Sequence, residues 1–333
     1  MERQIQPARL NATLFPIGLL HDRENGVRIL VVIALVIGFA LATGGLTVNS
    51  ANIPNILVQS AIRGVAACGQ ALVVMTAELD LSVSGVVALA MMAGGSLITG
   101  NPRYSLLGFA LSPWVAIPIM LLISTAFGLI NGLIVSRLRL PALIVTLGSW
   151  QIGLGLAYQM TGSGYVDQIP ESVAIIGQGL PYLPNPVIIF FIVVTATYFI
   201  LHHSRLGAEI MAVGGNARCA YIAGVKVPNI KVAVFGLAGL LYGVAAVLAM
   251  SRYMTSTMTQ ASGLELATIA AVAIGGVSLS GGKGTILGVL LGILIIGIID
   301  NGLSVMGVGP AYTSIAKGII IVAAIIIDNW FRA

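Results

Sequence analysis

The chain has 333 residues, of which 58% are hydrophobic and only 8% are charged, and its formal net charge is +5. A soluble domain carries about 25% charged residues, and a soluble chain of this length could not bury so much apolar surface. The composition therefore excludes a soluble protein and indicates an integral membrane protein.

The apolar residues form long continuous runs. Runs of about 20 apolar residues are typical of membrane-spanning helices, whereas the strands of membrane barrels alternate polar and apolar positions. Ten runs follow one another, at about residues 28–46, 54–76, 82–99, 113–135, 141–160, 184–202, 231–251, 262–278, 285–304 and 312–329. The sequence predicts an all-α, polytopic membrane protein of about ten transmembrane helices. Residues 1–27 are predicted as a cytoplasmic leader and residues 28–333 as a single transmembrane domain.

Basic residues predict the orientation, because cytoplasmic loops of membrane proteins are enriched in lysine and arginine. With the N-terminus inside, twelve of the sixteen basic residues lie on the cytoplasmic side, and only Arg103 and Arg252 lie outside. An even number of spans then places the C-terminus inside as well. Two halves of five spans would have opposite orientations, which is the arrangement of an inverted repeat.

Two short segments interrupt the apolar pattern. Residues 78–82 are either a tight cytoplasmic hairpin or the break of a helix that dips into the membrane. Residues 276–284 are predicted as a tight cytoplasmic turn, because a phosphate-binding loop would need glycine at Val277 and serine or threonine at Gly284. Gly284, Gly288 and Gly292 recur every four residues and predict a helix-packing ridge.

Polar residues inside the spans are candidates for a solute path. Charges there are costly and frequently functional, so Arg63, Glu265, Asp300 and Lys317 either pair within the bundle or line a path. Amide and hydroxyl groups suit sugar-like solutes, although they also join helices by hydrogen bonds. The candidate pathway residues are Arg63, Gln70, Asn131, Thr146, Ser149, Gln151 and Asn301.

A basic, polar loop at residues 203–230 lies between the sixth and seventh runs. Gly214-Gly215-Asn216 is typical of a turn, and Ala217 to Ile222 predict a short helix that Gly224 closes as a C-cap. Such a helix, held between two spans at the membrane surface, transmits force if a soluble partner binds it. The alternative is an ordinary solvated loop that carries the positive charges of the cytoplasmic side.

The sequence predicts neither a metal site nor a catalytic site. His21, His202 and His203 lack the three or four converging ligands that a metal needs, and no serine–histidine or histidine–aspartate arrangement is visible within the spans. We therefore expect no cofactor, no enzymatic activity and no nucleic-acid partner. Any dependence on ATP must come from another protein.

Several motifs are jointly specific. They are Arg205-Leu206-Gly207, Ala212-Val213-Gly214-Gly215-Asn216, Ala223-Gly224-Val225, Gly263-Leu264-Glu265-Leu266, residues 274–285, Asn301-Gly302-Leu303, Leu79-Asp80-Leu81-Ser82-Val83 and residues 141–148. With them the chain resembles, over about residues 50–328, the permease subunits of bacterial ABC importers for monosaccharides, of the ribose, xylose, arabinose and galactose class. The wider superfamily includes autoinducer-2 and branched-chain amino acid permeases. The family usually has a Gly-Gly pair and a hydrophobic residue before the Asp-Leu-Ser, where this chain has Ala77-Glu78-Leu79.

The resemblance implies a multi-pass protein of the bacterial inner membrane that takes a monosaccharide, ribose-like or another simple sugar, from a periplasmic sugar-binding protein. It also implies cytoplasmic ABC ATPase subunits, which alone hydrolyse ATP, and a second permease subunit, identical or paralogous, within the lipid bilayer. The loop 203–230 would contain the coupling helix that docks on the ATPase. The residues expected in this coupling are Arg205, Gly207, Gly214, Gly215, Asn216, Arg218 and Gly224.

Two other functions stay open at this point. An ion-coupled secondary transporter of a small polar solute would use Arg63, Glu265, Asp300 and Lys317 as a charge relay. A membrane scaffold would move no solute at all.

Overall fold

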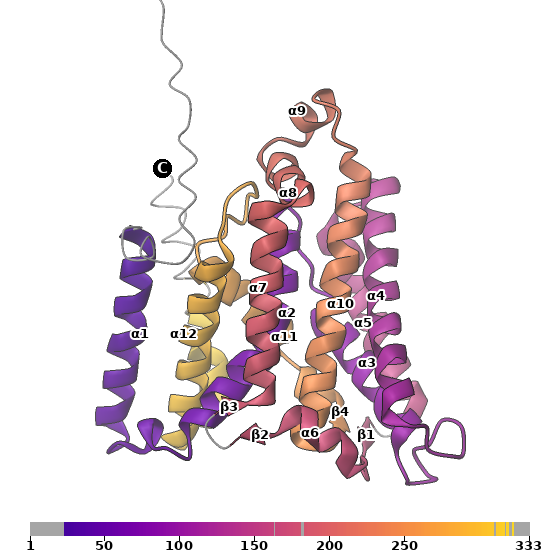
Figure 1. Ribbon diagram of the computed structural model, residues 1–333, viewed down its shortest axis with the longest axis vertical. Coiled ribbons are helices and arrows are strands. Elements are labelled where there is room, and N and C mark those ends of the chain that lie inside the picture. The colour runs from indigo at the N-terminus through magenta and orange to yellow at the C-terminus, as the bar shows by residue number, and fades with distance from the viewer. Residues whose placement is uncertain are drawn as a thin grey trace, which may run out of the picture.

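The computed structural model describes residues 23–162, 164–180, 183–309, 311–316, 318–319 and 322. Long helices stand side by side and run between two ends of the bundle (Figure 1). They are α1 (Arg23–Ala42), α2 (Ile53–Met75), α4 (Pro113–Arg137), α5 (Ala142–Thr161), α7 (Asn185–His203), α10 (Val227–Tyr253) and α12 (Ile286–Val305). Two shorter helices, α3 (Val83–Ile98) and α11 (Leu264–Ile274), belong to the same bundle. We call the two ends the α8–α9 end, at the top of the figure, and the strand end, at the bottom.

Shorter elements occupy these two ends. The helices α8 (Arg205–Gly215) and α9 (Ala217–Ile222) lie at the first end. The other short elements are α6 (Ala174–Gly177), the 3₁₀ helices η2 (Leu46–Val48), η3 (Glu171–Val173) and η4 (Met258–Ala261), and the strands β1 (Tyr165–Val166), β2 (Gly179–Leu180), β3 (Leu183–Pro184) and β4 (Ser256–Thr257).

The helices occupy the predicted apolar runs. Nine of the ten runs coincide with α1, α2, α3, α4, α5, α7, α10, α11 and α12 to within about five residues at each boundary. The predicted leader, apart from its last residues, and most of the tenth run, with Lys317, lie outside the described residues. Within the described part, six helices are long and apolar enough to cross a membrane: α1, α2, α4, α7, α10 and α12.

Helix α3 is shorter than a span and is enclosed by its neighbours. All of its 16 residues are buried, and it packs against α4, α5, α10 and α11. A helix that is apolar all round is stable where other helices cover every face. Because α2 ends at Met75 and α3 begins at Val83, residues 76–82 form a non-helical break, and Asp80 within it is only 1% exposed. Of the two alternatives for this segment, the structure therefore favours the buried break over a surface hairpin.

Glycines bring helix backbones into direct contact. A Cβ on Gly288 would overlap the Gly275 carbonyl group, and one on Gly292 would overlap the Ala271 carbonyl oxygen. The predicted ridge therefore packs α12 against α11, as expected for helices in lipid, where small residues allow close approach. Gly284 precedes α12 and lies in the turn instead.

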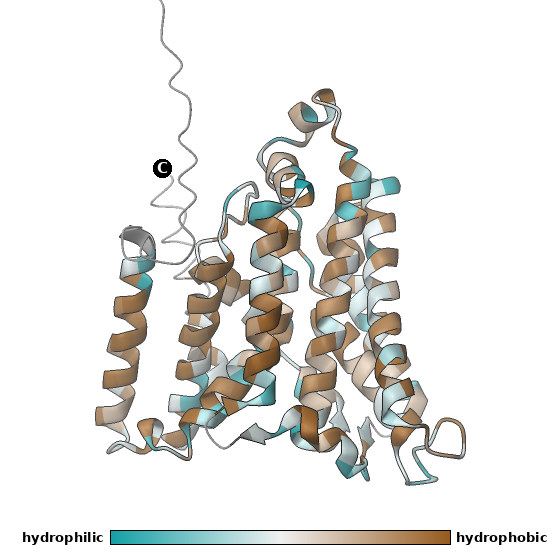
Figure 2. Ribbon diagram, viewed as in Figure 1, coloured by the Kyte–Doolittle hydropathy of each residue, from teal (hydrophilic) through white to brown (hydrophobic). Residues whose placement is uncertain are grey.

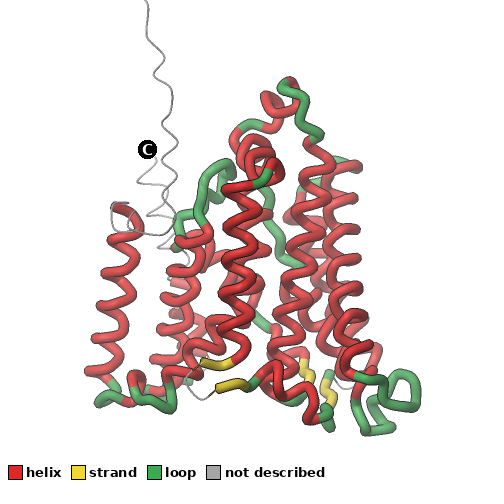
Figure 3. Tube along the Cα trace, in the orientation of Figure 1, coloured by secondary structure: helices red, strands yellow, loops and turns green. Residues whose placement is uncertain are grey.

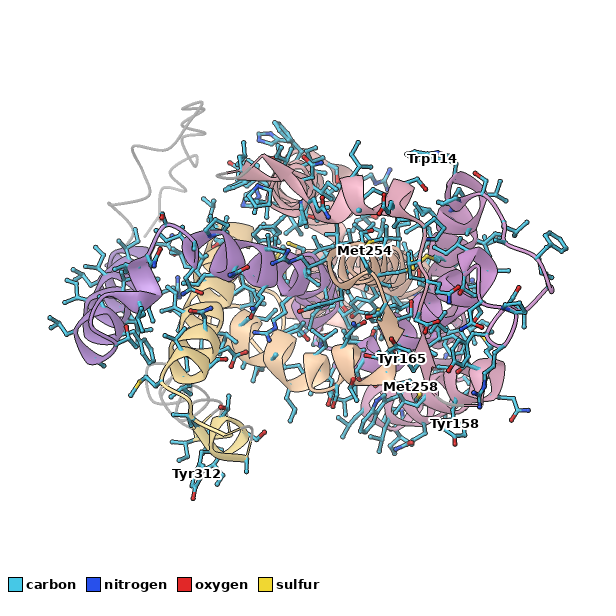
Figure 4. The ribbon with its side chains drawn as sticks, turned by 90° about the horizontal axis from the view of Figure 1, so that it is seen from below. Trp114, Tyr158, Tyr165, Met254, Met258 and Tyr312 are labelled. Carbon is cyan, nitrogen blue, oxygen red and sulfur yellow. The ribbon has the colours of Figure 1, made fainter. Side chains whose placement is uncertain are left out.

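Two small antiparallel strand pairs were not predicted for an all-α chain (Figure 3). Tyr165 pairs with Thr257 in β1–β4, and Leu180 pairs with Leu183 in β2–β3. Both pairs lie at the strand end. Seen from this end, Tyr158, Tyr165 and Met258 lie near one another, whereas Trp114 and Tyr312 lie toward opposite edges (Figure 4). Hydrophobic residues cover the long helices, whereas hydrophilic residues concentrate at the two ends (Figure 2).

Candidate functional site

The loop between α7 and α10 folds into two capped helices at the α8–α9 end. The Ser204 hydroxyl accepts a hydrogen bond from the Gly207 amide at 3.2 Å and caps α8. The Asn216 side chain accepts from the Cys219 amide at 2.9 Å and caps α9. Gly224 follows α9 with φ of +88°, the left-handed conformation that commonly ends a helix. The predicted short helix and its glycine C-cap are therefore confirmed.

Helix α8 is amphipathic, and its length was not predicted. Ile210 and Val213 are buried against the bundle, whereas the Arg205 side chain is 90% exposed and pairs with Glu209 at 2.9 Å. The expected turn at Gly214 and Gly215 is the last part of this helix, and Asn216 alone connects it to α9. The spacing of Leu206, Ile210 and Val213, with Ser204 as a cap, was the signal for a helix here.

The seven predicted coupling residues divide into two groups. The first group is exposed to solvent and consists of Arg205, Gly215, Asn216, Arg218 and Gly224. The other two, Gly207 and Gly214, are buried. Their backbones lie so close to the carbonyl oxygens of Leu201 and Met75, respectively, that a Cβ on either glycine would overlap that oxygen. The first group is available to a partner, and the second holds α8 against the bundle.

Two exposed apolar residues of α9, Tyr221 and Ile222, were not among the predicted coupling residues. Tyr221 is 71% exposed and Ile222 is 76% exposed, beside the exposed Arg218. Exposed aromatic and aliphatic side chains next to arginine are typical of the centre of protein interfaces. The signal was available, since these two are large apolar residues next to each other in the basic loop.

A buried polar network surrounds the break between α2 and α3. The Ser82 amide and hydroxyl donate to Asp80 Oδ1 at 2.8 and 2.6 Å. The Tyr242 hydroxyl of α10 lies 3.1 Å from Asp80 Oδ2 and 3.0 Å from Gln70 Oε1 of α2. A hydroxyl has one proton, so it donates to only one of them at a time, and a rotated Gln70 amide would donate to the tyrosine oxygen instead.

Two further predicted residues join the same network. Asn131 of α4 donates to the Ser82 hydroxyl at 3.1 Å, and the Thr146 hydroxyl of α5 accepts from the Leu81 amide at 3.0 Å. The structure therefore brings Gln70, Asn131 and Thr146 together around one segment, through side-chain contacts from α2, α4, α5 and α10. Asp80, Ser82 and Tyr242 were not proposed as pathway residues, because the sequence alone does not bring α10 beside the break.

A second polar cluster links α2 to α12 nearer the strand end. Arg63 forms an ion pair with Asp300. Asn52 and Asn301 exchange hydrogen bonds of 2.7 and 3.1 Å. Arg63 and Asn301 are therefore partners of helix-joining contacts, which is one of the two roles that the sequence left open for such residues.

The remaining predicted pathway residues lie on α5. Ser149 is buried, whereas Gln151 is exposed on the outer face of the helix. A cavity of about 500 Å³ opens elsewhere, at the strand end, between Asn55, Gln178 and Arg252. Arg252 donates to Asn55 Oδ1 at 2.8 Å across it. None of the seven predicted pathway residues lines this cavity.

Comparison with known proteins gives a consistent result. The chain is 36% identical over 315 residues to the ribose import permease protein RbsC of Escherichia coli K12, covering 93% of this chain and 94% of that protein. It is 31% identical over 322 residues to the fructose import permease protein FrcC of Rhizobium meliloti, covering 94% and 87%. It is 34% identical over 288 residues to the L-arabinose ABC transporter permease protein AraH of Azospirillum brasilense, covering 84% and 80%.

No solved structure matches the chain. A family model described as "Branched-chain amino acid transport system / permease component" matches residues 52–325, nearly the whole helical bundle. The chain therefore belongs to this family of transport permeases, as its motifs indicated.

Proposed function

We propose that this chain is the permease subunit of an ATP-driven importer in the bacterial inner membrane, and that it transports a monosaccharide delivered by a periplasmic binding protein. The solute class rests on the relatives, which are named for ribose, fructose and L-arabinose. The α8–α9 surface is the observation that carries the ATP-driven part. It offers Arg218, Tyr221 and Ile222 to a soluble partner on a helix fixed between α7 and α10.

The α8–α9 end faces the cytoplasm in this proposal. Arg28, at the start of α1, donates to the Ile274 carbonyl oxygen at 3.1 Å, and Arg137 donates to Asn229 beside the start of α10 at 2.9 Å. These basic residues therefore gather at the same end as α8 and α9, whereas Arg252 contacts Asn55 at the strand end. The distribution supports an N-terminus inside, and we keep ten spans and the inverted five-helix repeat as parts of the proposal.

A second permease subunit covers the outer face of α5. The opposite face of this helix packs on α3, where a Cβ on Gly153 would lie 2.7 Å from the Gly85 carbonyl oxygen. The outer face exposes Gln151 and Gln159, together with Gly148 and Gly155. Amide side chains are unfavourable against lipid, so a face of this kind is stable against another subunit or a polar path. We place the solute path between the two copies of α5.

Reconstitution tests the proposal directly. The chain is combined in proteoliposomes with its ATPase and binding protein, and uptake of radiolabelled ribose, fructose and L-arabinose is measured with and without ATP. We expect ATP-dependent uptake of at least one sugar. The double variant Asn216→Asp, Arg218→Glu should stay in the membrane but fail to couple ATP hydrolysis to uptake, because it reverses charge on the docking helix.

A matched control is Arg103→Glu, which reverses charge on an exposed residue outside the α8–α9 surface. It should couple ATP hydrolysis to uptake as the unchanged chain does. Normal uptake by the double variant would contradict the proposal. Uptake driven by an ion gradient without any ATPase would instead support the secondary transporter, although the pairing of Arg63 with Asp300 favours a structural role for two members of its relay.

A further inference from the structure

The backbones of three chain segments are in direct contact below α8. They are Met75–Ala77 at the end of α2, Gly214–Gly215 at the end of α8, and Gly281–Gly282 in the turn before α12, and we call them the glycine junction. The Gly282 amide donates to the Met75 carbonyl oxygen at 3.0 Å. Met75 is the last residue before the buried break, and the end of α8 also contacts it, because a Cβ on Gly214 would overlap its carbonyl oxygen.

Steric contact in the junction leaves no room for adjustment. A Cβ on Gly214 would overlap the Met75 carbonyl oxygen and lie 2.5 Å from the Gly282 nitrogen. A Cβ on Gly281 would lie 2.7 Å from the Ala77 nitrogen and 2.8 Å from the Gly214 carbonyl oxygen. Close-packed backbones of this kind move together, because they have no flexible side chains to absorb a shift. Gly214 is thus set to transfer any movement of α8 to residues 75–77.

The next residue of the break is tied to the other side of the same loop. Glu78 forms an ion pair with Lys231 in the first turns of α10, and both side chains are largely buried, with exposures of 17% and 20%. Residues 223–226 connect α9 to α10. Both ends of the α8–α9 loop are therefore attached to residues 75–78, one by backbone packing and one by an ion pair.

Ala77, between these two attachments, has φ of +62°, a conformation that an alanine adopts only where its surroundings hold it. Three residues further on, Asp80 contacts Tyr242 on α10 and Ser82 at the start of α3. A displacement of residues 75–78 thus reaches the network that fixes the start of α3.

We propose that Gly214, Glu78 and Lys231 are positioning residues for coupling, which transfer movement of α8 and α9 to the break between α2 and α3. The inference rests on the proposed function, since it assumes that an ATPase moves α8 and α9. It assigns a role to Glu78, which stands where the family pattern has a different residue.

Hydrogen exchange of the full complex tests the transfer. The chain is purified with its ATPase in lipid nanodiscs, and amide exchange is compared without nucleotide and with a non-hydrolysable ATP analogue. In the unchanged chain we expect the analogue to change exchange both in α8–α9 and in residues 76–82. The change in the break should be about tenfold, which lies within the range of typical allosteric couplings. Gly214→Ala should keep the α8–α9 response and reduce the response of the break to less than about twofold.

Further variants separate positioning from stability. Glu78→Gln should also weaken the response of the break, and the exchanged pair Glu78→Lys, Lys231→Glu should restore it, which a loss of stability would not do. Gly38→Ala is the matched control, because Gly38 is also a helical glycine and nothing lies within 4 Å of the place that its Cβ would take. Glu78→Gln keeps the test decisive if Gly214→Ala does not fold.

The outcomes are distinct. If the ATPase binds and α8–α9 responds, but residues 76–82 respond equally in the Gly214→Ala or Glu78→Gln chains and in the unchanged chain, the inference is wrong and the proposed function stands. A break that never responds has the same meaning. If no ATPase binds, the proposed function is wrong and the inference falls with it.

Discussion

The variant Tyr242→Phe removes one hydroxyl group and measures how much the contact with α10 stabilises the break between α2 and α3. Tyr242 is 1% exposed, and its hydroxyl lies within hydrogen-bond distance of both Asp80 and Gln70. In Tyr242→Phe the ring still fills its space, but Asp80 Oδ2 loses this donor. We therefore expect a loss of polar contact without a packing cavity.

The size of the effect follows from two limits. A buried acceptor left without its donor costs about 1–3 kcal/mol in soluble proteins. Interhelical hydrogen bonds in one membrane protein average about 0.6 kcal/mol and reach about 1.7, because the unfolded state in the membrane also finds partners. A carboxylate acceptor in a closed site belongs near the upper end, so we expect Tyr242→Phe to lower the free energy of unfolding by about 1–1.5 kcal/mol.

The assay is reversible unfolding in mixed micelles by added sodium dodecyl sulfate, followed by tryptophan fluorescence. Tyr253→Phe is the matched control, since this tyrosine lies on the same helix and is 48% exposed. The double variant with Asp80→Asn completes a thermodynamic cycle, and the coupling between the two residues should be about 1 kcal/mol. Equal effects of Tyr242→Phe and Tyr253→Phe, or strictly additive effects in the cycle, would refute the reasoning.

Two further predictions concern the helix contacts of α12. Asp300→Asn should destabilise the protein by about 2–3 kcal/mol. This is somewhat less than the loss of a partner from a fully buried pair, because the Arg63 side chain is 24% exposed. The same unfolding assay in micelles measures the effect, and a value below about 0.5 kcal/mol would count against a structural ion pair. Gly292→Ala should lower the free energy of unfolding by about 1–3 kcal/mol, because its methyl group overpacks against the Ala271 carbonyl group. Gly38→Ala should leave the melting temperature unchanged in thermal unfolding. Equal melting temperatures for the two variants would contradict close packing of α12 on α11.

Helix positions were predictable because each apolar run is long and continuous, so that the hydrophobic signal leaves little choice. The extent of the break at residues 76–82 was not, since Asp80 and Ser82 read equally well as a surface hairpin. Their burial depends on Tyr242, which lies 162 positions further along the chain than Asp80. Hydropathy reports whether a residue tolerates lipid, and it carries no information on which distant helix supplies a polar partner.

In the candidate site, too, some glycines were predictable from the sequence and others were not. Gly224 was predictable as a C-cap because its left-handed conformation is a local property of one residue. Gly214 was read as turn chemistry, yet it lies within α8 and its conformation is available to other residues. Its identity is dictated by the Met75 carbonyl oxygen, on a helix that the sequence places far away. A glycine required by backbone conformation can therefore be recognised from the local sequence. A glycine required by backbone contact can be recognised only when both chain segments are known, and here Gly214, a glycine of this second kind, connects the α8–α9 loop to the segment that leads into the buried network.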